Sequence, residues 1–426
     1  MPGFPPSIDR GPMQQFCLQR RRRRSMRAKT IEVIRCGFSN RPVRNSTRRG
    51  ALVAALAFHC AISAHAQMPE QGGHLAAPDN WLVNSGQPWH HTVRGASTVS
   101  RLGNREPTAE EKVVVEKAKA LFARSSAKAM ALVDDGAVVW SETKTPITQE
   151  ALVFGFSIGK TVTGLAVGQA ICAGKLALSS RLEDHVTELA STDLGRATVQ
   201  DLLTMRSGTW EGNKDTSVWS PEQAQAIAMG RMNWLELLKT DKVSAAASST
   251  FGGKRKPGEV FSYKSTDPIA LGVALARATG TRYAEWVEQT VLLPAGIEGP
   301  AAIAQDRATG YGQGDGALRM RFDDWVRLAV WVRKSESQPG CLGDYVRDSM
   351  KPMTPTGKIG SMPDSYGYLT WVRGESSWAI GHGGQRIAWN RRNGRTLVTF
   401  SSVEDYMRDL NQLYAEWSSL PSLNIP

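Results

Sequence analysis

Two stretches of the chain carry hydrophobic residues at helical spacing, and they predict helices of different kinds. Residues 108–124 place apolar side chains on one face behind Thr108, with Glu111 in the first turn, which predicts a capped amphipathic helix. Residues 157–173 are almost all small or apolar, with Gly174 behind them. This second pattern is typical of a helix buried on every side and ended by a glycine cap, so we expect it to lie in the middle of the fold.

Strand patterns lie early and late in the sequence. The apolar runs 129–133 and 137–140 flank Asp134-Asp135-Gly136, a strong signal for a β-hairpin. Near the other end of the chain, a second turn signal, Asn393-Gly394, stands between apolar runs. The late strands are expected at 366–372, 378–380, 386–390 and 396–401.

The middle of the chain is mainly helical in pattern. Beyond it, residues 323–332 and 404–418 predict two further helices, the last of them amphipathic. Strands at both ends with helices between them predict an α+β fold. In it, an antiparallel sheet flanked by helices is completed by both ends of the chain, with a mainly helical insert lobe at about 180–300. The helices of this lobe are expected at 199–205, 221–238, 268–279 and 283–293.

The first 66 residues do not have the pattern of a folded domain. They hold 13 Lys and Arg against 2 acidic residues, and an apolar run at 51–62 is followed by Ala64-His65-Ala66. This order is typical of a signal peptide cleaved before Gln67, and the run is too short to span a bilayer. We therefore expect a periplasmic or secreted protein with no membrane segment in its mature form; the alternative is an N-terminal membrane anchor.

Outside this leader, the net charge of the chain is close to zero. Of 52 basic and 40 acidic residues, 39 and 38 remain in 67–426, so the formal net charge of +12 divides into +11 for the leader and +1 for the body. The basic character is therefore no evidence that the folded part binds nucleic acid. Residues 67–107 are rich in Gly, Pro, His and Trp and predict an extended arm, and 108–426 predict a single domain.

Cysteine usage excludes two classes of protein. Only Cys172 and Cys341 follow the predicted cleavage point, which is too few for a disulfide framework and gives no metal-binding cluster with histidine. The pair permits one bridge, but two free thiols are the simpler expectation. We expect neither a metal nor another cofactor.

Ser157 is the strongest candidate for a nucleophile. Lys160 lies one helical turn after it, so a hydroxyl and an amine share a face, and a desolvated lysine can act as the base that a serine requires. Ser125-Ser126-Ala127-Lys128 and Ser141-Glu142-Thr143-Lys144 have the same spacing, but neither heads a long apolar helix. Gly155 to Gly159 also fit the G-x-S-x-G nucleophile elbow. The structural alternative is an ordinary N-cap serine.

Two later segments carry the other candidate groups. In Phe261-Ser262-Tyr263-Lys264-Ser265, the Tyr263 phenol is a candidate proton shuttle if a cation such as Lys160 lies beside it; otherwise it is a packing residue. In Gly381-His382-Gly383-Gly384-Gln385, the glycines allow a substrate to approach a strand edge. The backbone N–H groups of Gln385 and Ser157 are a candidate oxyanion hole, and the alternative is a Gly-rich turn with an exposed histidine.

These segments, in this order, resemble the penicillin-recognising serine hydrolases, a family that includes class C β-lactamases, D-Ala-D-Ala carboxypeptidases, esterases and 6-aminohexanoate-dimer hydrolases. The family pattern is S-x-x-K, then Y-x-N or Y-x-S, then K, H or W before x-G, and the resemblance covers about 110–420. It implies a class C β-lactamase-like fold, with Ser157, Lys160 and Tyr263 catalytic and Ser265, His382, Gly383, Gly384 and Gln385 binding the substrate or its oxyanion. Further matches are Gly174-Lys175-Leu176-Ala177-Leu178, Asp201-Leu202-Leu203-Thr204-Met205-Arg206-Ser207-Gly208 and Gly312-Gln313-Gly314-Asp315-Gly316.

Two departures from the family pattern bear on the substrate. Ser265 stands where lactamases and peptidases usually carry Asn, and His382 stands where lactamases usually carry Lys. A neutral histidine supplies less charge to an anionic substrate than lysine does. The resemblance therefore favours an amidase or esterase similar to the 6-aminohexanoate-dimer hydrolases, acting on a small ester or amide or a short peptide-like molecule. The oligomeric state is not readable from these patterns.

Three alternatives stay open at this point. The first is a D,D-peptidase or β-lactamase that acts on cell-wall peptides or β-lactams. The second is an α/β-hydrolase that uses Ser157 with His382 as its base. The third is a non-catalytic binding protein on a hydrolase fold. In the helical lobe, Trp210 and Trp219 are candidates for lining an apolar acyl pocket.

Overall fold

The computed structural model describes residues 82–83, 90–209, 220–247, 254–316, 318–357 and 361–423. All of them belong to one compact unit, Cys60–Pro426. The predicted leader at 1–66, Trp210 and Trp219 lie outside the described residues. Within the described ranges, every helix is too short or too polar to cross a membrane.

At the centre of the fold, the described residues form a nine-stranded sheet, whose strand order is β2-β4-β3-β13-β12-β11-β10-β9-β8. Neighbouring strands are antiparallel except β2 and β4, which run parallel. The predicted hairpin is confirmed, with Asp135 and Gly136 at positive φ in its turn. The strands are β2 (Gly103–Asn104), β3 (Ala127–Asp134), β4 (Ala137–Thr143), β8 (Thr354–Pro355), β9 (Ser365–Tyr366), β10 (Trp371–Arg373), β11 (Ser376–Ile380), β12 (Arg386–Asn390) and β13 (Arg395–Ser401).

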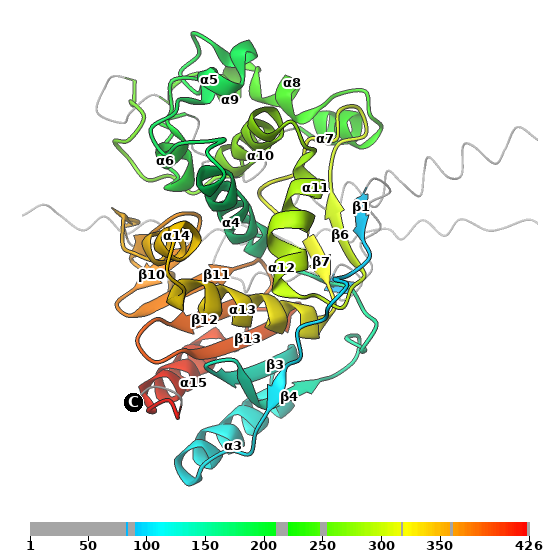
Figure 1. The fold of residues 1–426 in the computed structure, drawn as a ribbon, viewed down its shortest axis with the longest axis vertical. Coiled ribbons are helices and arrows are strands. Elements are labelled where there is room, and N and C mark those ends of the chain that lie inside the picture. The colour runs from blue at the N-terminus through cyan, green and yellow to red at the C-terminus, as the bar shows by residue number, and fades with distance from the viewer. Residues whose placement is uncertain are drawn as a thin grey trace, which may run out of the picture. The chain divides into compact units, whose positions relative to one another are not determined.

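The two ends of the described chain meet in this sheet, as predicted. Strand β3 pairs with β13 over their whole lengths, although more than 250 residues separate them in the sequence. Helices α3 (Ala109–Arg124) and α15 (Met407–Ser419) lie together on one face, and α13 (Phe322–Ser337) lies on the other (Figure 1). The predicted capping box of α3 is present, because Thr108 accepts from the N–H of Glu111 while Glu111 accepts from that of Thr108.

Helix α4 (Ile158–Cys172) runs between this sheet and the helical lobe (Figure 1). It packs against α10 (Thr266–Thr279), α14 (Cys341–Ser349) and β11, so nearly every side of it is covered, as its apolar composition predicts. The other elements of the lobe are α5 (Leu182–His185), a 3₁₀ turn (Thr187–Leu189), α6 (Val199–Leu203), α7 (Pro221–Ala228), α8 (Trp234–Leu238), α9 (Asp241–Ser244), α11 (Tyr283–Val287), a π-helical turn (Glu288–Leu292) and α12 (Leu293–Ala295).

A second, four-stranded sheet has no counterpart in the sequence-based prediction. Its order is β1-β6-β7-β5, and all its pairs are antiparallel. The expected extended arm contributes β1, so part of that arm is strand. These strands are too short to give an alternating pattern, which is why the sequence does not reveal them. They are β1 (His90–Val93), β5 (Val153–Phe154), β6 (Ala301–Ala304) and β7 (Leu318–Met320).

Three expectations are wrong in detail. The helix predicted at 221–238 is two helices, α7 and α8, separated by a turn at Gly230, whose φ is +70°. The strand predicted at 366–372 is two short strands, β9 and β10, joined by a turn. The expectation of two free thiols is also wrong, because Cys172 and Cys341 form a disulfide that joins the end of α4 to the start of α14. Burial and tertiary proximity decide that pairing, and neither is visible in the spacing of the two cysteines.

Candidate active site

Ser157 lies at the start of α4, where the chain leaves β5. It occupies the N-cap position, but its side chain makes no capping hydrogen bond and its backbone is already helical, at φ −66° and ψ −2°. The N-cap side chains of α3, α6, α7 and α8 (Thr108, Thr198, Ser220 and Asn233) all accept from a backbone N–H instead. Ser157 is therefore not used as a cap, which is the alternative that the sequence leaves open.

The Ser157 hydroxyl instead contacts the lysine one turn later. The Lys160 ammonium donates to Ser157 Oγ at 3.0 Å and to the main-chain oxygen of Asp315 at 2.9 Å. The Lys160 side chain is 3% exposed, and its Nζ lies 3.9 Å from Asp315 Oδ2. Asp315 comes from the Gly-rich segment 312–316, so this segment holds the lysine as well as resembling a family motif.

A glycine allows that close approach. A Cβ atom on Gly159 would lie 2.7 Å from the main-chain oxygen of Gly316, closer than real Cβ contacts come. Phe156, immediately before Ser157, has a positive φ of 47°, which is uncommon for a bulky residue. The turn from β5 into α4 is therefore held in an unfavourable conformation by its surroundings, a feature that is frequent at functional sites.

Tyr263 lies beside Lys160. The Lys160 ammonium is 5.1 Å from the centre of the Tyr263 ring, within the range of a cation–π contact. The ring packs against Trp371 with 5.2 Å between ring centres and against Tyr366 at 6.2 Å. Three residues predicted from two separate segments of the sequence, Ser157, Lys160 and Tyr263, thus form one cluster.

The residues that follow Tyr263 tie the site to the helical lobe. Lys264 is buried, with its ammonium 3.8 Å from Asp267 Oδ1 and 3.3 Å from the main-chain oxygen of Thr209. Asp267 accepts from the Ser207 hydroxyl at 2.7 Å, in the segment that resembles the T-M-x-S-G motif. Burial lowers the pKa of Lys264 and raises that of Asp267. Ser265 is the N-cap of α10 and, like Ser157, makes no capping bond; its link to the cluster is its place two residues after Tyr263.

The segment from Gly381 to Gln385 forms the turn between β11 and β12 and lies against the start of α4. The His382 ring is half-buried and is 5.6 Å from the Phe156 ring in an edge-on contact, so it is not the exposed histidine of the alternative interpretation. Gly383 and Gly384 both have positive φ, which a tight turn requires. The Gln385 side chain donates to the main-chain oxygen of Phe154 at 3.5 Å. The two segments expected to supply the oxyanion hole are therefore neighbours.

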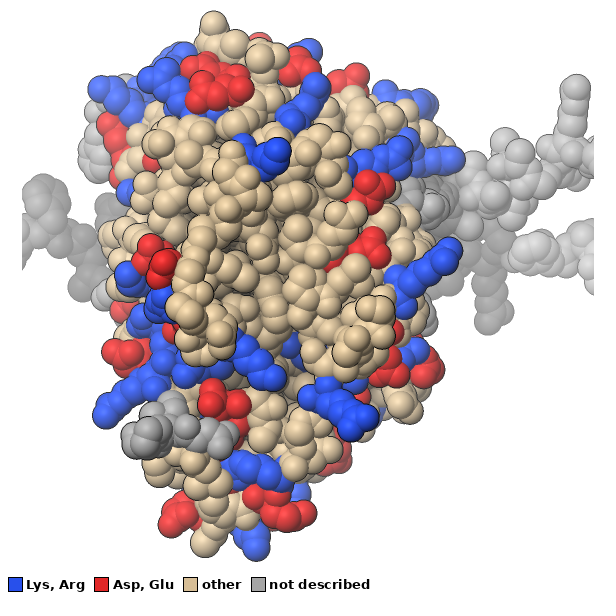
Figure 2. All heavy atoms as spheres, viewed as in Figure 1, with Lys and Arg blue, Asp and Glu red and all other residues tan. Residues whose placement is uncertain are grey.

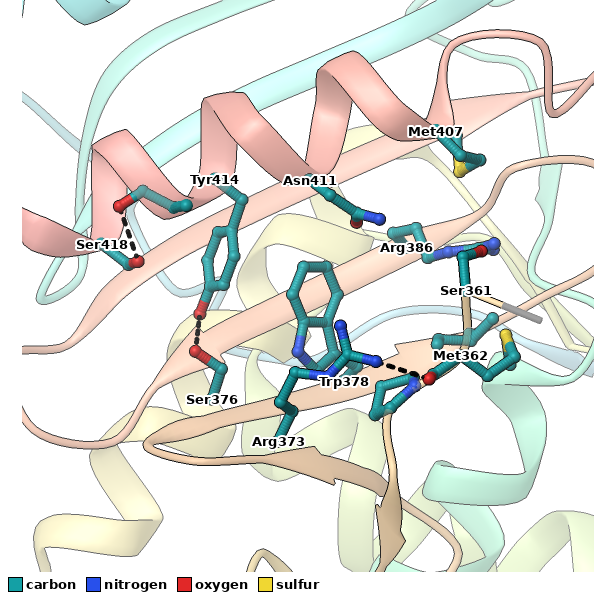
Figure 3. A pocket seen from close by; sticks show the side chains of 13 residues that line it. Ser361, Met362, Arg373, Ser376, Trp378, Arg386, Met407, Asn411, Tyr414 and Ser418 are labelled. Carbon is teal, nitrogen blue, oxygen red and sulfur yellow. Dashed lines mark hydrogen bonds between the residues drawn. The ribbon is translucent and has the colours of Figure 1, made fainter. Parts of the chain in front are cut away.

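Arg386 supports this turn from behind, a role that the sequence does not reveal. Its Nη1 donates to the main-chain oxygens of Gly381 and Gln385, each at 2.8 Å, and its Nη2 lies 3.4 Å from Glu404. Burial lowers its pKa. Arg386 also lines a cavity of about 220 Å³ between α15 and β10–β11, together with Trp378 and Tyr414 (Figure 3). None of the candidate catalytic residues lines that cavity, so it is separate from the cluster.

The α/β-hydrolase alternative is wrong. That fold requires a mainly parallel sheet with the nucleophile elbow after one of its strands, whereas Ser157 follows an edge strand of a small antiparallel sheet. Lys160, which that alternative leaves without a role, is in direct contact with the Ser157 hydroxyl. Within the described residues, no group of His, Cys, Asp and Glu has the arrangement of a metal site.

The surface seen in Figure 2 agrees with the near-neutral body. Acidic and basic side chains are interspersed around a mainly uncharged centre on this face. No broad region of a single sign is visible there, in contrast to the basic leader.

Comparison with known proteins gives one family and a consistent set of folds. A family model described as Beta-lactamase matches residues 119–416. A search of curated proteins found no match. Among solved structures, a proposed 6-aminohexanoate-dimer hydrolase from Bacillus anthracis matches with a TM-score of 0.61 and 17% identity, covering 77% of this chain and 90% of that one.

Two further solved structures have the same fold. EstCE1, described as a hydrolase with promiscuous acyltransferase activity, matches with a TM-score of 0.57 and 14% identity, covering 73% of this chain and all (100%) of that one. A class C β-lactamase variant matches with a TM-score of 0.55 and 14% identity, covering 73% and 97%. The TM-scores establish a shared fold, and at identities this low they establish the fold alone. The predicted class C β-lactamase-like α+β architecture is confirmed.

Proposed function

The chain belongs to the Beta-lactamase family of serine hydrolases, and from that premise we propose that it cleaves an ester or amide bond through an acyl-enzyme on Ser157. The Ser157 oxygen attacks the carbonyl carbon, and its proton passes to the base formed by Lys160 and Tyr263. The same pair returns the proton to the leaving alcohol or amine. Water then attacks the acyl-enzyme and gives a proton to that base. The bond between the acyl carbon and Ser157 Oγ breaks, the base returns the proton to Oγ, and the acid is released.

The oxyanion of each tetrahedral intermediate lies between the N–H groups of Ser157 and Gln385. Backbone donors held in place before the reaction stabilise such a charge without reorganising. The start of α4 adds the positive end of its helix dipole. Arg386 holds the Gln385 side of this site, because it binds the two main-chain oxygens that close the turn.

One observation carries this proposal: the Lys160 ammonium is 3.0 Å from a serine hydroxyl that stands at a helix start without capping it. A nucleophile must keep its oxygen available and must have within hydrogen-bond reach a group that accepts its proton, which Lys160 Nζ does in its neutral amine form. Ser157 meets both conditions.

The direct test is Ser157→Ala, with Ser141→Ala as a matched control because Ser141 also stands in an S-x-x-K segment but is exposed on β4. Both proteins are assayed with p-nitrophenyl esters and exposed to a fluorophosphonate, with intact mass as the readout. We expect Ser157→Ala to lose at least about 10³-fold in kcat and to form no adduct, while Ser141→Ala behaves as wild type. An adduct or normal turnover in Ser157→Ala would refute the assignment. Absence of any adduct in wild type would favour the non-catalytic binding protein.

The substrate class follows from the two departures from the lactamase pattern. Ser265 and His382 favour linear esters or short amides, and the structural match to the proposed 6-aminohexanoate-dimer hydrolase supports the same direction. A panel of p-nitrophenyl esters, linear amides and a chromogenic cephalosporin, run on wild type and Ser157→Ala, ranks these classes. If the cephalosporin has the highest kcat/KM, the β-lactamase or D,D-peptidase alternative is correct instead.

We also propose that the protein is exported and cleaved before Gln67. Disulfides persist mainly in oxidising compartments, so the bridge between Cys172 and Cys341 supports this proposal. N-terminal sequencing of protein recovered from the periplasm or medium tests it. Recovery of the uncleaved chain from the cytosol would contradict it.

A further inference from the structure

Arg319, on β7, is a deeply buried cation with no acidic partner among the residues that the structure describes. It is 8% exposed, and its Nε and Nη2 atoms make no hydrogen bond to any described part of the chain. Burial alone lowers the pKa of its guanidinium to about 10, so it stays charged at neutral pH. An uncompensated buried charge is costly for a folded protein.

Other buried arginines of the described chain are compensated. Arg395 pairs with Glu111, and Arg327 pairs with Asp324 at 2.8 Å and with Glu298 at 3.2 Å. Within the described ranges, the compensation for Arg319 is the face of the Phe154 ring, 4.4 Å from its guanidinium carbon. A ring face attracts a cation, but it supplies no acceptor for the N–H groups. Arg319 therefore has unused N–H donors of the kind that bind an anion or oxygen acceptors.

The position of Arg319 relates it to the candidate active site. Arg319 pairs directly with Phe154 across the two strands, and Phe154 precedes Ser157 by three residues, a span of at most about 11 Å. The Phe154 ring lies 4.2 Å from the Phe156 ring, which contacts His382 at 5.6 Å. A continuous row of rings therefore connects the cation to the turn that faces Ser157.

We propose that Arg319 binds a carboxylate of the substrate, with Phe154 and Phe156 lining the path between that carboxylate and the bond that Ser157 attacks. This inference rests on the proposed function and adds a substrate class to it: esters or amides in which an apolar chain joins a carboxylate to the scissile carbonyl. It also revises the argument that His382, in place of lysine, supplies little charge to an anionic substrate. The cation that a lysine would supply in the third motif comes here from Arg319, on a different strand.

The kinetic test compares two esters of equal chain length, the mono-p-nitrophenyl ester of adipic acid and p-nitrophenyl hexanoate. The variants are Arg319→Met, which keeps an unbranched apolar stem without the charged group, and Arg319→Lys, which keeps the charge. We expect Arg319→Met to lower the ratio of kcat/KM values, anionic over neutral, by about 10- to 100-fold, as the loss of a charge-assisted hydrogen bond predicts. Arg319→Lys should restore part of it. Arg321→Met is the control, because Arg321 already has Glu150 and Glu298 as partners, and it should leave the ratio unchanged.

A binding test without turnover separates this inference from the proposed chemistry. In the Ser157→Ala background, adipate should raise the melting temperature, and the same adipate concentration should have no effect once Arg319→Met is added. Arg319→Met alone should fold with an equal or higher melting temperature, because it removes an unpaired buried charge. An unchanged ester ratio, or adipate stabilisation that persists in Arg319→Met, would overturn the role of Arg319 even if Ser157 is the nucleophile. If Arg319→Met does not fold, Arg319→Lys and Arg319→Gln are compared in the same two assays.

Discussion

The starts of α4 and α10 are built alike and differ in what their lysines contact. The two helices are buried and pack against each other, and each begins with a serine that makes no capping bond. Lys160 contacts the hydroxyl of that serine and a main-chain oxygen, with Asp315 at 3.9 Å. Lys264 is paired with Asp267, a carboxylate that is completely buried. The first lysine can exchange a proton with a reacting group, whereas the second holds two segments together.

The largest expected effect is on catalysis at the start of α4. Lys160→Met should lower kcat/KM by about 10²–10⁴-fold, the usual contribution of general acid–base catalysis, and should leave the folded structure in place. Steady-state kinetics with a p-nitrophenyl ester and a circular dichroism spectrum measure the two properties. A variant that keeps its activity would remove the main difference between the two helix starts.

Replacing the lysine at the start of α10 should lower the free energy of unfolding. Lys264→Met leaves Asp267 buried without its cation, and breaking a buried pair in this way costs about 3–5 kcal/mol in the free energy of unfolding. Urea denaturation measures it. The double variant Lys264→Met/Asp267→Asn should recover part of the loss, because the two residues are coupled. If Lys264→Met is as stable as wild type, the pair does not have the structural role given to it here.

The far ends of the two helices provide a third comparison. A glycine in a left-handed conformation follows each helix, Gly280 after α10 and Gly174 after α4, but α4 also carries the disulfide to α14 at its end. Cys172→Ser/Cys341→Ser should lower the free energy of unfolding by about 2–5 kcal/mol, since the bridge closes a long loop of the unfolded chain. Thermal unfolding with and without reductant is the measurement. Equal melting temperatures under both conditions in wild type would show that the bridge is not formed in solution.

The smallest effects concern the serine of α10. Ser265→Ala should leave the melting temperature unchanged, because no cap is lost, and should lower kcat/KM by about 2- to 10-fold if one neutral hydrogen bond to substrate is removed. Thr108→Ala is the matched control: it removes a real cap and should cost about 0.5–2 kcal/mol of stability without affecting kcat/KM. A drop in melting temperature for Ser265→Ala equal to that of Thr108→Ala would assign Ser265 a capping role instead.

Local sequence patterns predicted the structure correctly where residues close together in the sequence decide it. The turn at Asp135-Gly136, the cap at Thr108 and the buried helix α4 all depend on positions a few residues apart, and each is present as predicted. The divided helix at 221–238 was missed because its break depends on one turn at Gly230 inside a favourable pattern. The small sheet was missed because its strands are two to four residues long and pair only across the fold.

The sequence by itself determined the candidate chemistry: a serine and a lysine one helical turn apart, followed by a tyrosine segment and a Gly-rich turn in the order of a known family. These are properties of residue type and spacing. Only the tertiary structure decided which lysine contacts a hydroxyl and which a carboxylate, that Cys172 and Cys341 meet, and that Arg319 is a buried cation with no acid beside it in the described part of the chain. Burial and pairing arise from contacts between distant parts of the chain, and no local pattern encodes them.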